Sequence, residues 1–113
     1  MFDSAFYTTV FPQLVQQECR RQAEKVAVVE LLLGDGGTLD ICHVLQLADK
    51  WLAVAFFRDP KTCEDMDMAF LPYELVARVT VSFHSPQTRK LGFSVEGGPA
   101  TLASLPSATG GPS

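Results

Sequence analysis

VAVVELLLGDGGTLDICHVLQLADKWLAVAFF, residues 26–57, is the stretch that decides the fold of this chain. From Val26 onward, apolar side chains recur at every second position, which is the period of a β-strand with one buried face. Residues 34–37, Gly-Asp-Gly-Gly, interrupt this alternation with residue types that accept the backbone angles of a tight reversal. The alternation resumes at Leu39 and continues to Leu47. This stretch therefore predicts a β-hairpin.

Three more strands are predicted after the hairpin. Residues 51–57 are apolar on both faces, which is typical of a strand covered on both sides, so we expect them to form the central strand. Alternating residues from Met68 to Phe70 and from Leu75 to Phe83 predict the fourth and fifth strands, separated by Pro72-Tyr73-Glu74. A weaker pattern over residues 90–95 indicates an additional edge strand.

The N-terminal part predicts a short amphipathic helix after Pro12, because Leu14, Val15, Glu18 and Gln22 fall on one stripe. Residues 1–11 form an aromatic lead-in that is expected to cover the core or contact another subunit. Residues 12–95 would then form one domain, and residues 96–113, rich in Gly, Pro, Ser, Ala and Thr, are expected to be a disordered tail. The predicted fold class is mainly β: an N-terminal helix followed by a five-stranded, strongly bent antiparallel sheet that forms a small barrel.

Composition limits the classes of function. The 113 residues carry a net charge of -4, so the whole-molecule field repels polyanions and argues against sequence-blind nucleic-acid binding. No stretch approaches the roughly 18 apolar residues of a membrane helix. The N-terminus lacks the basic region and cleavage site of a secretory signal. Together with Cys19, Cys42 and Cys63, which we interpret as free thiols, this predicts a cytoplasmic protein with no membrane contact.

The helix followed by five consecutive antiparallel strands resembles the Sm-like family (LSm and Hfq-type proteins) from Phe11 to Phe83. Leu33-Gly34-Asp35-Gly36, followed by Thr38-Leu39, is similar to the turn at the end of the family's first strand. Residues 70–79, Phe-Leu-Pro-Tyr-Glu-Leu-Val-Ala-Arg-Val, resemble the segment that joins the family's fourth and fifth strands. Other SH3-like small barrels satisfy the same short patterns.

The resemblance implies a ring of six or seven copies that binds RNA. Strand four of one subunit would pair with strand five of the next, and the expected interface residues are Phe70, Leu71, Val76, Val79 and Val81. RNA contacts would fall on Asp35 and Tyr73, to which we add Arg78 because it lies on the polar face of the fifth strand beside the interface. Asp35 replaces the family's asparagine, and Glu74 adds a carboxylate beside Tyr73, so weak or altered RNA binding is expected.

No pattern in the chain indicates catalysis, a metal or a cofactor. Cys42 and His43 are neighbours on a strand and therefore point to opposite faces, so they are not expected to bind one metal ion together. Glu64, Asp65 and Asp67 lack the spacing of a calcium loop. The glycines at 34–37 precede a strand instead of a phosphate-binding helix. The sequence therefore predicts a protein that is not an enzyme.

A second interpretation remains open beside the Sm-like one. An SH3-like module, monomeric or dimeric and with no role in nucleic-acid binding, would recognise a partner protein through the polar loop from Arg58 to Asp67 and the aromatic lead-in. Both interpretations share the fold. They differ in whether the outer strands join copies of the chain into a ring or the chain binds a partner protein as a monomer or dimer.

Overall fold

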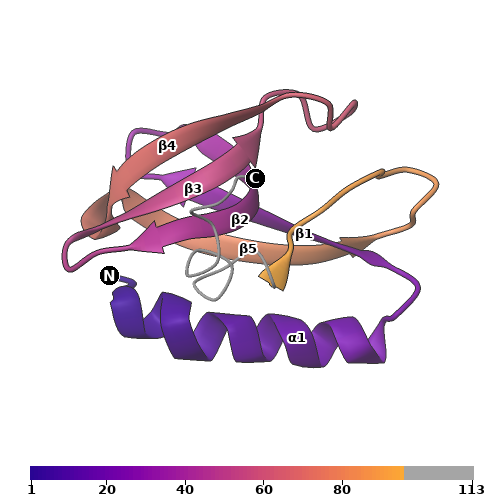
Figure 1. Cartoon of the computed structure of the whole chain (residues 1–113), viewed down its shortest axis with the longest axis horizontal. Coiled ribbons are helices and arrows are strands. Elements are labelled where there is room, and N and C mark those ends of the chain that lie inside the picture. The colour runs from indigo at the N-terminus through magenta and orange to yellow at the C-terminus, as the bar shows by residue number, and fades with distance from the viewer. Residues whose placement is uncertain (96–113) are drawn as a thin grey trace, which may run out of the picture.

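The computed structural model of the chain describes residues 1–95, and the tail predicted for residues 96–113 lies outside these residues. One π-helical turn, η1 (Phe6–Val10), runs directly into the helix α1 (Phe11–Arg21). Five strands follow: β1 (Val26–Leu33), β2 (Thr38–Leu47), β3 (Trp51–Phe57), β4 (Met66–Pro72) and β5 (Val76–His84), with a 3-10 turn η2 (Tyr73–Leu75) before β5. Figure 1 shows α1 lying along one side of the sheet.

All four junctions of the sheet are antiparallel, and the strand order is β4-β3-β2-β1-β5. The central strand is therefore β2, and the prediction that residues 51–57 form the central strand is wrong. β3 is nevertheless almost entirely buried, as its apolar composition indicates. The reason for the error is that β5 pairs with the free edge of β1, for example Val29 with Val81, which moves the centre of the sheet by one strand.

The predicted fold class, an N-terminal helix and a five-stranded antiparallel sheet, is confirmed, but the sheet is not closed into a barrel and its strong bend is not confirmed. Among the described residues β4 pairs with β3 and β5 pairs with β1, so each leaves one edge free. The pairing of β2 with β3 shifts register twice, between Ile41 and His43 and between Val44 and Gln46. Such bulges increase the local twist of a strand.

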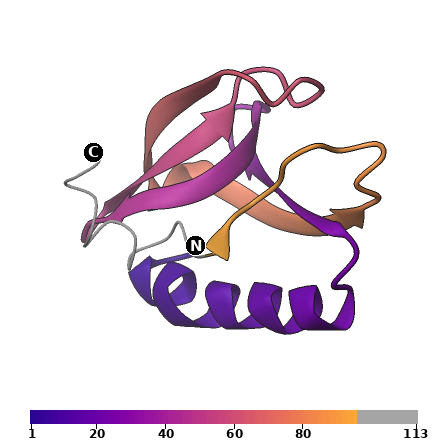
Figure 2. The same ribbon diagram turned by 45° about the vertical axis from the view of Figure 1, so that its right-hand side comes forward.

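Helix α1 contributes its buried face to the core. Phe11 and Val15 lie one helical turn apart and are both buried, and Pro12, which has no N–H to donate, comes directly after the π-helical turn η1. They pack on the same face of the sheet as Val29 and Leu31 of β1, which are fully buried. Figure 2 shows the helix and the sheet as two layers, and the side chains of this core lie between them.

Residues 85–95 return across the sheet without forming a strand, so the edge strand predicted at residues 90–95 is wrong. The N–H of Phe93 donates to the carbonyl oxygen of Ala27 at 2.8 Å, and the N–H of Ser94 donates to that of Cys42 at 2.7 Å. These two acceptors belong to different strands, which means that the segment crosses the sheet instead of extending its edge. The ring of Phe93 reaches Phe11, with 5.3 Å between ring centroids.

Candidate functional site

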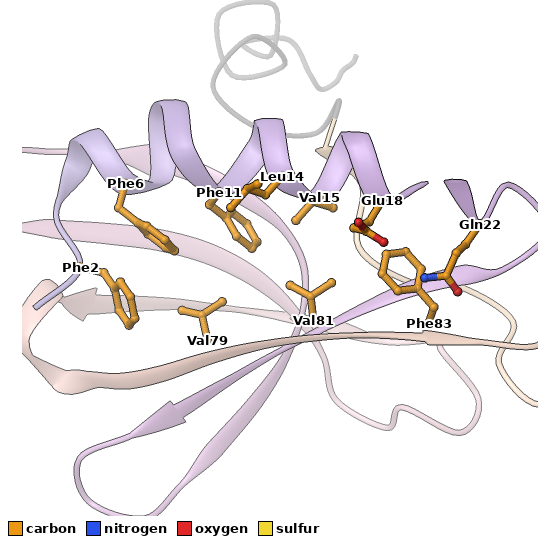
Figure 3. Close-up of a pocket in the computed structure, with 10 residues that line it drawn as sticks. All are labelled: Phe2, Phe6, Phe11, Leu14, Val15, Glu18, Gln22, Val79, Val81 and Phe83. Carbon is orange, nitrogen blue, oxygen red and sulfur yellow. The ribbon is translucent and has the colours of Figure 1, made fainter. Parts of the chain in front are cut away.

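An apolar groove of about 540 Å³ lies between α1 and β5. The side chains that line it come from the N-terminal segment and helix (Phe2, Phe6, Phe11, Leu14, Val15, Glu18 and Gln22) and from the strand (Val79, Val81 and Phe83). In Figure 3 the two sets point toward one another across the groove. Leu14 is 56% exposed, and the polar groups Glu18 and Gln22 stand together at the end of the groove near Phe83.

The aromatic lead-in builds one end of this groove. The rings of Phe2 and Phe6 pack in a tilted arrangement with 4.4 Å between their centroids, and Phe6 also contacts Tyr7 and Phe11. Phe2 and Phe6 are half-buried and pack against the core. The lead-in therefore extends the apolar surface of α1 toward Val79 on β5, which Figure 3 shows beside Phe2 and below Phe6.

Strand β4 carries an exposed apolar stripe, which consists of Met66, Met68 and Phe70. These side chains are 50%, 60% and 61% exposed, and their even spacing places them on one face of the strand. Leu71, which points to the opposite face, is buried in the core. The ring of Trp51 on β3 contacts the ring of Phe70 edge-on, with 5.7 Å between the ring centroids. Large apolar side chains that gather in this way on a free edge mark an interaction surface.

The residues predicted for the subunit interface divide into two groups. Phe70 is exposed, and Val79 and Val81 are half-buried at the groove. Leu71 and Val76 are buried in the core of the same chain. The first group is available to a second molecule, whereas the second group stabilises the monomer.

The turn that carries Asp35 and the segment that carries Tyr73 meet at one end of the sheet. The N–H of Gly34 donates to the carbonyl oxygen of Leu75 at 2.7 Å and joins the turn to η2. Gly36 has a φ of 93°, in the left-handed region that favours glycine, and the Asp35 carboxylate accepts the N–H of Gly37 at 2.9 Å. The two short motifs that resemble the Sm-like family are thus neighbours in space.

Of the three residues predicted to contact RNA, Asp35 and Arg78 are exposed and Tyr73 is buried. Arg78 lies opposite Leu32 of β1 and therefore close to the same end of the sheet. Glu74, also exposed, stands beside them in η2. Asp35, Glu74 and Arg78 together form an exposed rim at this end of the sheet. With two acidic groups and one basic group, this rim offers an anion little net attraction.

Tyr73 is occupied within the monomer. Its ring stacks on Tyr7, with 5.8 Å between centroids, and its hydroxyl donates to the carbonyl oxygen of Ala48 at 2.6 Å. Burial is the main cause that raises the pKa of both tyrosine hydroxyls. The ring of Tyr73 therefore stabilises the core and is not free to stack on a base.

Cys42 and His43 lie side by side, in contrast to the prediction of opposite faces. His43 Nδ1 is 3.4 Å from Cys42 Sγ. The prediction is wrong because the bulge between Ile41 and His43 breaks the alternation of β2. Burial lowers the pKa of the His43 imidazole and raises the pKa of the Cys42 thiol. Both shifts favour the neutral forms, a partly buried pair with no activated thiolate.

The loop between β3 and β4 is organised by short-range contacts. The Arg58 guanidinium donates two hydrogen bonds to Asp67, at 3.1 and 2.7 Å, and lowers the pKa of that carboxyl. Cys63 is buried with a φ of 56°, and its thiol contacts the Pro60 carbonyl oxygen at 3.2 Å. Within residues 1–95, no cluster of three or more His, Cys, Asp or Glu side chains is arranged to hold a metal ion.

Arg89 is the buried charged residue that sequence reasoning missed. Its side chain reaches Asp40 of β2 with two hydrogen bonds, at 2.8 and 2.6 Å, and Nε donates to the Leu91 carbonyl oxygen at 2.7 Å. The guanidinium also lies 5.2 Å from the centre of the Phe57 ring. No local pattern signals this contact, since the partners are 49 residues apart in the sequence.

Comparison of the chain with protein-family models, with curated proteins and with solved structures finds no match. Within the described part of the chain, no helix has the length and apolar character needed to cross a membrane. The interpretation of function therefore rests on the two apolar surfaces, the stripe on β4 and the groove beside β5.

Proposed function

We propose that this chain is a non-catalytic scaffold of the Sm-like kind, which assembles into a ring of six or seven copies through the two outer strands of its sheet. The observation that carries the proposal is that, within residues 1–95, β4 and β5 each leave one edge free, and that apolar side chains line both edges. A strand edge with unpaired N–H and C=O groups is a template for pairing with another chain.

A weak RNA ligand at the rim formed by Asp35, Glu74 and Arg78 belongs to this proposal. The joining of the Gly34 turn to η2 supports it, since both segments that resemble the family's RNA-contacting motifs reach the same end of the sheet. The burial of Tyr73 and the acidic groups of the rim limit the expected affinity. The three free cysteines support a reducing compartment such as the cytoplasm.

Sedimentation velocity of the untagged protein, combined with fluorescence anisotropy of a labelled single-stranded oligouridine at low ionic strength, tests both halves. We expect assembly that increases with concentration, and RNA binding that is lost as salt is added. Binding of the oligonucleotide that is absent even at low salt would remove RNA from the proposal. A protein that sediments as a monomer at every concentration would remove the ring.

The second candidate function is the SH3-like interaction module, which is favoured by a different observation. The aromatic lead-in builds one end of the groove, so an apolar segment of a foreign protein could lie between Phe6 and Val79 in a monomer. Loss of partner binding when residues 59–64 are replaced by the two-residue turn Asn-Gly, which keeps the pairing of β3 with β4, together with a monomeric mass would support this alternative.

A further inference from the structure

We infer that Cys63 is an oxidation site, at which hydrogen peroxide converts the thiol to a sulfenic acid that the thiol of Cys42 then captures as a disulfide. The bond would tie the loop between β3 and β4 to β2. The inference is independent of the proposed assembly, because it uses contacts within a single copy. It follows from the face on which Cys42 lies, from the surroundings of Cys63 and from the imidazole beside Cys42.

Cys42 lies on the same face of β2 as Asp40. Ile41, between them, is buried in the core, so its two neighbours point to the opposite face of the strand. On that face the Asp40 carboxylate accepts two hydrogen bonds from the Arg89 guanidinium, at 2.8 and 2.6 Å. Cys42 is therefore two residues along the strand from the carboxylate that holds Arg89 in place.

Cys63 approaches the same guanidinium from the loop. Its backbone has a φ of 56°, in the left-handed region, and its buried thiol contacts the carbonyl oxygens of Pro60 at 3.2 Å and of Leu91 at 3.7 Å. The Leu91 carbonyl oxygen also accepts the Nε–H of Arg89 at 2.7 Å. The hydrogen bonds to Asp40 are the main cause that raises the pKa of Arg89, and contact with Cys63 adds to it. The loop thiol therefore lies against Arg89.

The segment of residues 89–94 joins the surroundings of the two thiols. At one position the Leu91 carbonyl oxygen contacts the Cys63 thiol, and three residues later the N–H of Ser94 donates to the Cys42 carbonyl oxygen at 2.7 Å. Burial is the main cause that raises the pKa of the Cys42 thiol, and the nearby Cys63 thiol adds to it. The fold therefore brings together two cysteines that are 21 residues apart in the sequence.

Arg89 suits the first step of the oxidation. A thiolate is the nucleophile toward peroxide, and an adjacent guanidinium stabilises its negative charge. The Cys63 sulfur attacks one oxygen atom of the peroxide, the O–O bond breaks, and the hydroxide that leaves takes up a proton and becomes water. The sulfur gives two electrons to the peroxide and becomes a sulfenic acid. A water-sized oxidant can reach it after a small movement, because the neighbouring residues Lys61, Thr62 and Glu64 are exposed.

His43 suits the second step. Its Nδ1 is 3.4 Å from the Cys42 sulfur, and burial lowers the pKa of the imidazole, so the ring is neutral at pH 7. In the tautomer with its proton on Nε2, Nδ1 can accept the proton of the Cys42 thiol. The Cys42 sulfur attacks the sulfur of the sulfenic acid, the S–O bond breaks, and the departing hydroxide takes the proton from His43. Over both steps, two thiols and one peroxide give one disulfide and two molecules of water.

Serine variants separate the roles of the two thiols. Cys63→Ser should abolish both the sulfenic acid and the disulfide, whereas Cys42→Ser should leave a sulfenic acid at Cys63 that dimedone traps. Cys19→Ser, the matched control on α1, should form the disulfide at the wild-type rate. Circular dichroism checks that each variant keeps the fold. Trapping of a sulfenic acid at Cys42 in the Cys63→Ser variant would assign the first step to the other thiol and overturn the inference.

His43→Gln tests the proton transfer separately from the fold. The variant should form the sulfenic acid of Cys63 at the wild-type rate but close the disulfide roughly tenfold or more slowly, since no base takes the proton of Cys42. Wild-type rates of both steps would remove His43 from the proposed reaction.

Peptide mapping of the wild-type chain tests the disulfide itself. Trypsin places the three cysteines in three peptides, residues 1–20, 26–50 and 62–78. The full chain is treated with hydrogen peroxide, its remaining thiols are blocked with N-ethylmaleimide, and it is digested without reductant. We expect residues 26–50 to be joined to residues 62–78, with the blocking group on residues 1–20. A disulfide to residues 1–20, a disulfide between two chains, oxidised cysteines without a disulfide, or three unreacted thiols would each overturn the inference.

Discussion

Arg89 and Asp40 form an ion pair with two hydrogen bonds, and only 9% and 14% of their side chains are exposed. The contact ties residues 85–95 to β2, and the hydrogen bond is the main reason that the pKa of Arg89 is raised. Because water is largely excluded, the pair needs both partners: removing one leaves a charge that is poorly solvated.

We expect Arg89→Met to lower the free energy of unfolding by about 3 kcal/mol, the lower end of the range for a broken buried pair. Arg89→Lys should not restore the loss, since an ammonium group cannot make the two parallel hydrogen bonds. The double variant Asp40→Leu/Arg89→Met should be more stable than Arg89→Met alone. Urea unfolding followed by circular dichroism measures all three, and a double variant no more stable than the single would contradict this account.

The stacked pair Tyr7 and Tyr73 offers a matched comparison of two hydroxyl groups. The hydroxyl of Tyr73 donates to Ala48, whereas the buried hydroxyl of Tyr7 has no hydrogen-bond partner among the described residues. Tyr73→Phe should cost about 1 kcal/mol, and Tyr7→Phe should be neutral or stabilising. Equal losses in the two variants, measured by thermal unfolding, would show that the hydroxyl of Tyr7 is also paired.

Gly92 lies where the chain crosses β1. A Cβ atom at this position would collide with the carbonyl oxygen of Ala27, whereas one at Gly34 would make an ordinary contact with Leu75 at 3.6 Å. We therefore expect Gly92→Ala to destabilise the fold by about 1–3 kcal/mol and Gly34→Ala to be neutral or slightly stabilising. Chemical denaturation measures both. Indifference to Gly92→Ala would mean that residues 85–95 do not hold this path.

His43 predicts a pH dependence of stability. Burial lowers the pKa of His43 in the folded chain below the unfolded value of about 6.5. At pH values between these two pKa values, the unfolded state therefore binds more protons than the folded state. The free energy of unfolding should therefore decrease as pH falls through about 6.5, and level off below the folded pKa. His43→Gln should remove this part of the pH dependence. Urea midpoints at several pH values between neutral and mildly acidic test it, and equal slopes for both proteins would refute it.

Local sequence patterns predicted the elements of the fold but not all of their contacts. Alternation specified the hairpin at Gly34 and the strands on either side of it, because a strand with one buried face repeats every two residues. The same rule failed at Cys42 and His43, where a bulge depends on the pairing with β3 and leaves no local signal. The position of β5 beside β1 is likewise a consequence of tertiary pairing.

The candidate site was predicted only in part. Phe70, Val79 and Val81 were identified from their place on the outer strands, and the structure leaves them accessible. The groove itself was missed, because it arises from side chains of a helix and a strand that are more than 50 residues apart. The exposure of Met66 was missed for a related reason: an alternating pattern does not tell which face of an outer strand the core uses.

The central claim is that this chain assembles through the free edges of β4 and β5. A native mass spectrum of the untagged protein, sprayed at low ionic strength, tests it most directly because it reports the number of subunits and any bound nucleic acid together. The account predicts a species of six or seven times the mass of one chain, which Phe70→Asp converts to monomer. A wild-type protein found only as a monomer, at concentrations where it is fully folded, would contradict the claim.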